Sequence, residues 1–209
     1  MRSVYLDYNA TTPVAPSVAE AMQAFLMEHY GNPSSSHLLG QAAHQAVEES
    51  RRSVAKLLDA DPEEIVFTSG GTESNNLAIK GVCLRPEILR TSGTGESLGH
   101  IITTAIEHPA TSMPIRFLQK LGFEVSVCGC NEQGVVSPDA IASLFRADTR
   151  IVSVMHANNE TGVLQPIADI ADRCREKGIL CHTDAAQSIG KVDATVDMLV
   201  NSGHTYESD

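Results

Sequence analysis

The chain has 209 residues, 42% of them hydrophobic and 20% charged, so it can form one sizeable core but is too short for two ordinary domains. Its net charge of −11 disfavours nucleic acid or an anionic membrane surface as a partner. No apolar run reaches the roughly 18 residues of a membrane helix, and the N-terminus lacks the apolar core of a signal peptide. We therefore expect one globular, cytoplasmic unit that binds small molecules or proteins.

Five cysteines, an odd number in a chain of this size, are not typical of a disulfide framework and predict reduced thiols. Cys128 and Cys130 could form half of a metal site. No second pair and no histidine cluster follows them at zinc-ligand spacing, so no metal is predicted.

Apolar residues first recur at helical spacing, in the stretches 18–27 and 42–58. After Pro62 the pattern changes to short apolar runs that are typical of strands, each followed by a turn and a helical stretch. The expected strands are 65–68, 100–104, 124–128, 150–155 and 179–183. The expected helices are 75–82, 111–121, 138–145 and 167–177. Such alternation predicts an α/β fold with a mainly parallel sheet.

Two glycines in the sequence TSGGTESNN, residues 68–76, lie between an expected strand and the helix that follows it. Gly70 and Gly71 permit a tight bend, and Thr72 adds a hydroxyl beside the first amides of the helix. Those amides favour an anion such as a phosphate. A strand-to-helix turn with two glycines is also often only a turn, so both interpretations stay open.

Polar side chains follow two further expected strands. His108, in the sequence IEHP, would project from the carboxyl edge of the sheet, where open α/β sheets bind ligands. Its ring could stack on an aromatic cofactor, or His108 could be a capping or solvent-facing residue. Asn159, in HANNETG, could bind a cofactor oxygen or a substrate carboxylate, with an Asx turn closed by Gly162 as the alternative.

The last expected strand leads into HTDAAQ, where Asp184 would be a buried carboxylate that needs a cationic partner. A protonated pyridine ring is such a partner, and the pairing keeps the ring an electron sink. Gln187 can bond the hydroxyl of the same ring. The alternative for Asp184 is a helix cap.

Six motifs in chain order carry a family resemblance: YLDYNATTP, GNPSS, TSGGTESNNLAIKG, EHPA, HANNETGVLQPI and HTDAAQSIGK. Together they resemble the cysteine desulfurase and selenocysteine lyase group of class V aminotransferases. The resemblance implies a pyridoxal phosphate enzyme of fold type I, normally a homodimer, that takes sulfur or selenium from its amino-acid substrate and leaves alanine. It also implies that 1–209 form the three-layer large domain, with 1–15 as an N-terminal arm.

The resemblance assigns roles position by position. The phosphate cradle is implied to contain Gly71, Thr72, Ser202 and His204, and the ring is implied to contact His108, Asp184 and Gln187, with His108 also catalytic and Asn159 an active-site amide. Asn32 and Ser34, in GNPSS, match a loop near the entrance of the active site.

One position departs from the family pattern in a way that changes the expected chemistry. The family continues SGH with the lysine that holds the cofactor aldehyde, whereas this chain has Thr205 there. The family's small C-terminal domain, with its nucleophilic cysteine, also has no counterpart in the sequence. We therefore expect non-covalent pyridoxal phosphate at best and no turnover. The functional alternatives are a truncated cysteine desulfurase, a selenocysteine lyase, and a non-catalytic cofactor-binding or regulatory partner.

Overall fold

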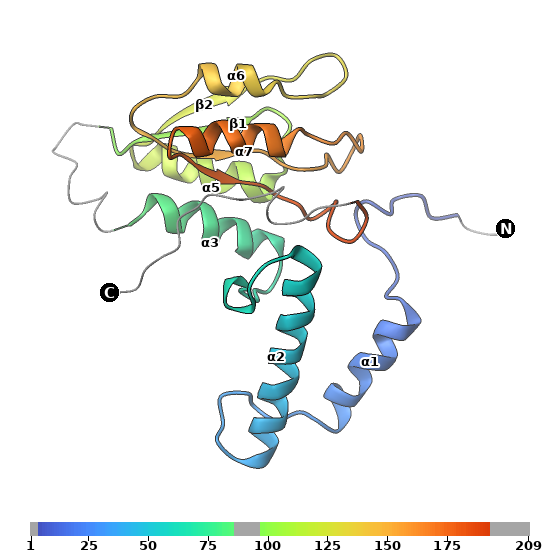
Figure 1. The fold of residues 1–209 in the computed structure, drawn as a ribbon. Coiled ribbons are helices and arrows are strands. Elements are labelled where there is room, and N and C mark those ends of the chain that lie inside the picture. Colours follow the sequence, from blue (N-terminus) through green and yellow to red (C-terminus); the bar gives the residue numbers. More distant parts are fainter. Residues whose placement is uncertain (1–3, 86–96, 193–209) are drawn as a thin grey trace. The chain divides into compact units, whose positions relative to one another are not determined.

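A computed structural model describes residues 4–85 and 97–192 (Figure 1). Contacts within the chain divide it into two compact units, Met1–Val66 and Phe67–Asp209, and each is described by itself. No helix of the described residues is both long and apolar enough to cross a membrane.

The first unit contains the helices α1 (Pro16–Met27) and α2 (Leu38–Leu58) and the short 3-10 helix η1 (Pro62–Glu64). The two expected helices are confirmed, although both begin earlier than the apolar periodicity indicates. Proline is favourable in the first turn of a helix, which accounts for the start of α1 at Pro16. His37 caps α2, because its Nδ1 accepts a hydrogen bond from the backbone N of Gly40 at 3.3 Å.

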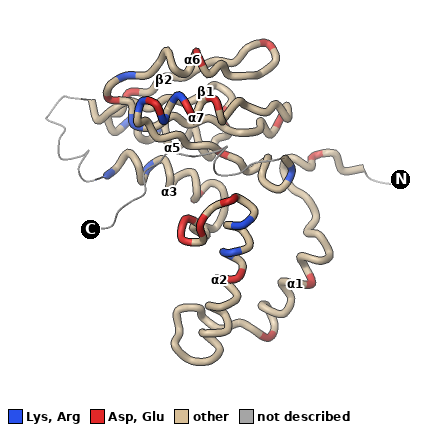
Figure 2. Tube along the Cα trace, viewed as in Figure 1, with Lys and Arg blue, Asp and Glu red and all other residues tan. Residues whose placement is uncertain are grey.

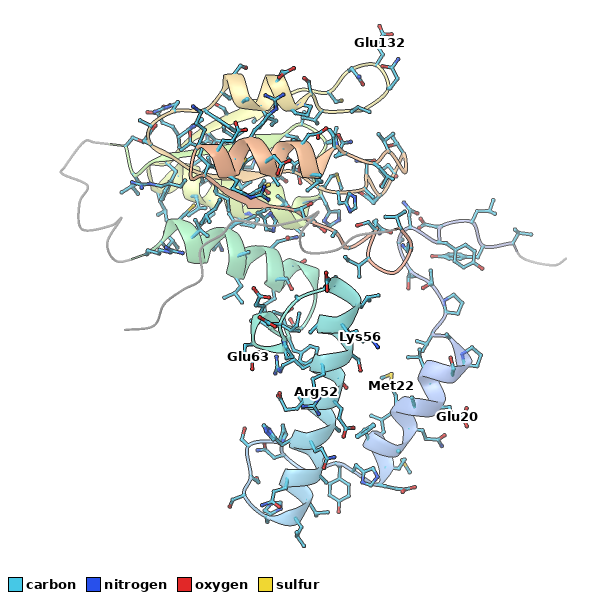
Figure 3. All side chains as sticks on the ribbon, in the orientation of Figure 1. Glu20, Met22, Arg52, Lys56, Glu63 and Glu132 are labelled. Carbon is cyan, nitrogen blue, oxygen red and sulfur yellow. The ribbon has the colours of Figure 1, made fainter. Side chains whose placement is uncertain are left out.

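Few side chains of the first unit are buried. No residue of α1 is buried, and α2 buries only small residues, Gly40, Ala43 and Ala55. Many of the unit's large apolar side chains are half exposed or more, such as Met22, which is labelled in Figure 3 and is 51% exposed.

The second unit is built on a four-stranded parallel sheet with the order β2-β1-β3-β4. Its strands are β1 (His100–Thr104), β2 (Glu124–Cys128), β3 (Thr149–Ser153) and β4 (Leu180–His182). Its helices are α3 (Gly71–Cys83), α5 (Pro109–Leu121), α6 (Pro138–Ser143) and α7 (Ile167–Glu176). The prediction of an α/β fold with a mainly parallel sheet is confirmed.

Alternation along the central strands produces two cores, one on each face of the sheet. Ile101 and Ile151 pack with residues of α3 and α5, whereas Ile102 and Val152 pack with residues of α6 and α7. Successive residues of these strands point to opposite faces of the sheet, and both are apolar because helices cover both faces. The result is a three-layer arrangement in this unit (Figure 1). The outer surface of α7 carries interspersed acidic and basic residues (Figure 2).

The expected strand at 65–68 is wrong. These residues have no strand partner in the sheet of the described chain, and Val66 and Phe67 are 65% and 48% exposed. An apolar run becomes a strand only where another strand supplies its hydrogen bonds, and no neighbour does so here. The stretch instead leads directly into α3, which starts at Gly71 rather than at the expected residue 75.

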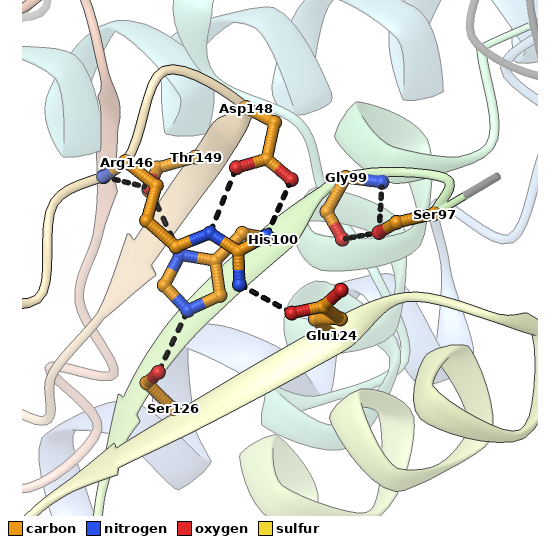
Figure 4. A network of polar contacts seen from close by, with 8 residues as sticks. All are labelled: Ser97, Gly99, His100, Glu124, Ser126, Arg146, Asp148 and Thr149. Carbon is orange, nitrogen blue, oxygen red and sulfur yellow. Dashed lines mark hydrogen bonds and ion pairs between the residues drawn. The ribbon is translucent and has the colours of Figure 1, made fainter.

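A buried histidine joins three strands at the amino end of the sheet (Figure 4). The Nδ1 of His100 lies 2.9 Å from Thr149 Oγ1, and its Nε2 lies 2.8 Å from Ser126 Oγ. Arg146 covers this corner and pairs with Glu124 and Asp148. Burial, the largest cause, lowers the pKa of His100, so the ring is neutral when the unit is folded near pH 7.

Replacing His100 with Ala is expected to destabilise the second unit by about 2–3 kcal/mol, because it removes two buried hydrogen bonds and leaves a cavity. Urea unfolding at pH 7, followed by circular dichroism, measures the change. Ser126→Ala removes only one of the bonds and should cost about 1 kcal/mol. Equal losses for the two variants would contradict a network centred on the histidine.

Candidate functional site

The carboxyl ends of β1, β3 and β4 are tied together by hydrogen bonds between the loops that follow them. The backbone N of His156, after β3, donates to the backbone O of Asp184, after β4, at 2.9 Å. The amide of Asn158 donates to the backbone O of Ile106, after β1, at 3.1 Å. The predicted site residues that follow these strands therefore belong to one edge of the sheet.

Asp184 is half-buried at this edge, and each of its carboxylate oxygens accepts a hydrogen bond. Oδ2 accepts from Nδ2 of Asn75 at 2.8 Å, and Oδ1 accepts from the backbone N of Ala186 at 3.1 Å. The second bond is the local cap that was the alternative for Asp184. The first is a long-range contact from α3 that a cap alone does not require. A carboxylate has about four acceptor positions, so capacity for a further donor or cation remains.

Asn75 is a site residue that sequence reasoning missed. It is only 4% exposed, and its amide holds the carboxylate of Asp184. The available signal was an asparagine at an inward position of a helix, since a buried amide needs a partner. The sequence does not say which partner that is, because the two residues are 109 positions apart.

His108 is the N-cap of α5, as its alternative interpretation predicted, and it is exposed. Its Nδ1 accepts a hydrogen bond from the backbone N of Ala110 at 3.1 Å. In the neutral ring this acceptor role places the proton on Nε2. Capping therefore orients the ring without occupying its Nε2 side.

A cavity of about 400 Å³ lies between α3 and α5 and contains two of the predicted residues, Thr72 and His108. The others that line it are Asn76, Lys80, Pro109, Ala110, Met113, Pro114 and Phe117. Lys80, whose Nζ lies 4.6 Å from the centre of the Phe117 ring, is a cation that sequence reasoning did not name. The cavity thus combines the start of α3, a histidine ring and a positive charge.

Two glycines with open space around them form the turn before α3. Gly70 has a φ of 155°, and a Cβ added to Gly70 or Gly71 would meet no other atom within 4 Å. The amides of the first helical turn have no acceptor within the helix and point toward its N-terminus. The side chain of Glu73 is held by the backbone N of Ser69 at 2.7 Å, and hydrogen bonds from Ser69 lower its pKa.

The Asx turn predicted as an alternative for Asn159 is formed instead by Asn158. The Oδ1 of Asn158 accepts from the backbone N of Glu160 and of Thr161, both at 3.0 Å. Gly162 closes the turn with a φ of 74°. Asn159 is half-buried, and its amide donates to Glu160 Oε1 at 3.0 Å. Its role toward a ligand stays a prediction.

Three further predicted residues, Gln187, Asn32 and Ser34, belong to the described chain, and the remaining ones lie outside it. Gln187 accepts a hydrogen bond from Lys191 Nζ at 3.0 Å. Asn32 belongs to the first unit, where its Oδ1 accepts from the backbone N of Ser34 at 2.9 Å. Ser202, His204 and Thr205 lie outside the described residues.

No group of three metal-binding side chains converges among the described residues. All five cysteines are free, and Cys130 alone is exposed. Two buried polar atoms beside the site lack a partner among the described residues, Glu107 Oε2 and Thr183 Oγ1.

The sequence profile described as Aminotransferase class-V matches residues 4–206. The chain belongs to this family. Among the relatives of this chain, a cysteine desulfurase IscS from Dictyoglomus turgidum is 48% identical over 198 residues, which cover 95% of the chain and 48% of the relative. A cysteine desulfurase IscS from Dechloromonas aromatica is 50% identical over 197 residues, which cover 94% of the chain and 47% of the relative.

Solved structures agree with this family membership. The structure described as SspA in complex with cysteine matches with a TM-score of 0.86 and 39% identity, over 93% of this chain and 54% of that one. A NifS-like protein matches with a TM-score of 0.85 and 39% identity, over 93% and 52% of the two chains. The chain therefore spans about half the length of the relatives that it matches.

Proposed function

We propose that the chain provides the cofactor-binding part of a pyridoxal phosphate-dependent cysteine desulfurase, which takes sulfur from L-cysteine and leaves L-alanine. The observation that carries this proposal is the Asp184 carboxylate, held by Asn75 at the carboxyl edge of the sheet with acceptor positions left for a cationic ring. The relatives named as cysteine desulfurases support sulfur rather than selenium as the substrate element.

Each residue has a separate task in this proposal. Pyridoxal phosphate, when bound, supplies an electron sink for bonds that break at the substrate's α carbon. Asp184 pairs with the ring nitrogen, Gln187 bonds the ring hydroxyl, and His108 stacks on the ring. Gly71 and Thr72, at the start of α3, bind the phosphate together with Ser202 and His204. Asn159 contacts a cofactor oxygen or the substrate carboxylate.

Thr205 favours a second candidate, a non-catalytic protein that binds the cofactor or regulates a full-length subunit. A threonine hydroxyl cannot form the Schiff base that a lysine amine forms at this position in the family. We infer non-covalent binding and no turnover by this chain. We also infer that 1–209 belong to one large domain with 1–15 as its arm, that the protein acts in the cytoplasm as a homodimer or as a partner subunit, and that no metal takes part.

The test is a titration of the purified chain with pyridoxal phosphate, followed by borohydride reduction and mass spectrometry. We expect saturable binding without a reduced adduct. Asp184→Asn should weaken binding roughly 10- to 100-fold, because it removes the anion that pairs with the ring nitrogen. Asp169→Asn, an exposed position on α7, is the matched control and should bind as the wild type does.

Two outcomes would contradict the proposal. Equal affinity for wild type and Asp184→Asn would mean that Asp184 does not hold the ring. A reduced adduct at one lysine, such as Lys80 in the cavity, would mean that the cofactor binds covalently despite Thr205.

A further inference from the structure

Glu107 is a half-buried residue whose carboxyl group uses only one of its oxygens for hydrogen bonds. Oε1 accepts from Thr104 Oγ1 at 2.7 Å and from the backbone N of Met155 at 2.9 Å. Oε2 is buried and has no hydrogen-bond partner among the described residues. Thr104 ends β1 and Met155 follows β3, so the carboxyl group joins two strands at the edge that carries the site.

This uneven bonding favours the neutral acid over the anion. A carboxylate spreads its charge over both oxygens, and a buried one needs donors or a cation at each. A neutral carboxylic acid has one carbonyl oxygen, which fits the two donors at Oε1, and leaves an uncharged O–H at Oε2, which costs less to bury without a partner than an oxygen that carries part of a negative charge. Asp184 differs, because both of its oxygens accept hydrogen bonds, as an anion requires.

The surroundings of Glu107 act in the same direction. Burial is the largest cause that raises its pKa, to about 7, against the hydrogen bonds from Thr104 and Met155, which lower it. Among the described residues, the titratable groups of the neighbouring segments include His108, Cys128, His156, His182 and Asp184. Of these, Asp184 is the group whose charge acts on Glu107, and it raises the pKa further. Burial lowers the pKa of His156, so that ring adds no positive charge near neutral pH.

We propose that Glu107 is a positioning residue and is a neutral acid in the folded chain. Its Oε1 joins the ends of β1 and β3, and Asp184 is the anion that pairs with a cationic ring. The identity of that ring rests on the proposed function. The protonation state of Glu107 is a property of the chain without any ligand, so the two ideas can fail separately.

The first test compares wild type with Glu107→Gln, which imitates the neutral acid, in urea unfolding between pH 5 and pH 8 without cofactor. A raised pKa in the folded state stabilises the protein fully below about 4.5, and this stability is lost as the pH rises to about 7. The unfolding constant of the wild type relative to the variant should therefore increase on the order of 100-fold from pH 5 to pH 8.

The matched control is Glu132→Gln, at an exposed loop position labelled in Figure 3. The unfolding constant of the wild type relative to this variant should not change with pH. A constant ratio for Glu107→Gln as well would overturn the proposal. When both chains also carry Asp184→Asn, the change of the relative unfolding constant from pH 5 to pH 8 should be smaller, because the neighbouring negative charge is gone. An unchanged or larger change would overturn the link between the two carboxyl groups.

Two further measurements do not depend on the stability of one variant. Infrared spectra of the wild type at pH 6 should show a buried neutral carboxylic acid band that Glu107→Gln lacks, and its absence from the wild type would overturn the proposal. If the chain binds pyridoxal phosphate, Glu107→Gln should keep an affinity within about threefold of the wild type at pH 6. A loss as large as that of Asp184→Asn would show that Glu107 acts as an anion.

Discussion

Replacing Ile102 with Ala is expected to destabilise the second unit by about 3–4 kcal/mol. Ile102 is fully buried in the central strand β1 and packs in the core that includes Ile170 of α7 and Ile141 of α6. Truncation removes the transfer free energy of three carbon atoms and leaves a cavity between a rigid sheet and two helices. The measurement is the free energy of unfolding in urea at pH 7, followed by circular dichroism.

Two variants control for the nature of the change. Ile102→Val removes a single methylene group and should cost about 1 kcal/mol. Val127→Ala, on the edge strand β2 where Val127 is 60% exposed, should change stability by less than about 0.5 kcal/mol. A loss at Ile102→Ala no larger than that at Val127→Ala would show that this face of the sheet is not a packed core.

His182 is expected to make the second unit sensitive to acid. It ends β4, and its Nδ1 lies 2.8 Å from Ser153 Oγ of β3. Burial lowers the pKa of His182 to about 4, against the charge of Asp184, which raises it. A depressed pKa in the folded state means that stability is present above the unfolded value of about 6.5 and is lost as the pH falls toward 4.

Between pH 7 and pH 4, a chain with His182 is expected to lose about 2–3 kcal/mol more of its free energy of unfolding than a chain with His182→Asn. The asparagine keeps a polar atom near Ser153 but does not titrate. Glu107 stabilises the protein in the opposite direction over an overlapping pH range, so both chains should carry Glu107→Gln. Urea unfolding at several pH values measures the difference. If the two chains lose stability in parallel, another group causes the acid sensitivity.

The residues of the candidate site could be named from the sequence where a local motif specifies chemistry. The sequence HTDAAQ indicated Asp184, and the turn TSGGT indicated a helix start with room for an anion. Asn75 and Glu107 were not predicted, although both lie within quoted motifs, because their importance depends on burial and on partners elsewhere in the chain. The assignment of the Asx turn to Asn159 rather than Asn158 failed because adjacent asparagines offer the same chemistry.

By itself, the sequence determined the α/β class and four of the five expected strands, because the period of apolar residues is a local property of helices and strands. It also determined the family, through motifs that keep their order along the chain. Only the tertiary structure decided that 65–68 form no strand, since a strand needs a partner for its backbone hydrogen bonds. Only the tertiary structure placed Asn75 on Asp184 and enclosed Glu107 beside it, because burial and long-range pairing arise when distant segments pack.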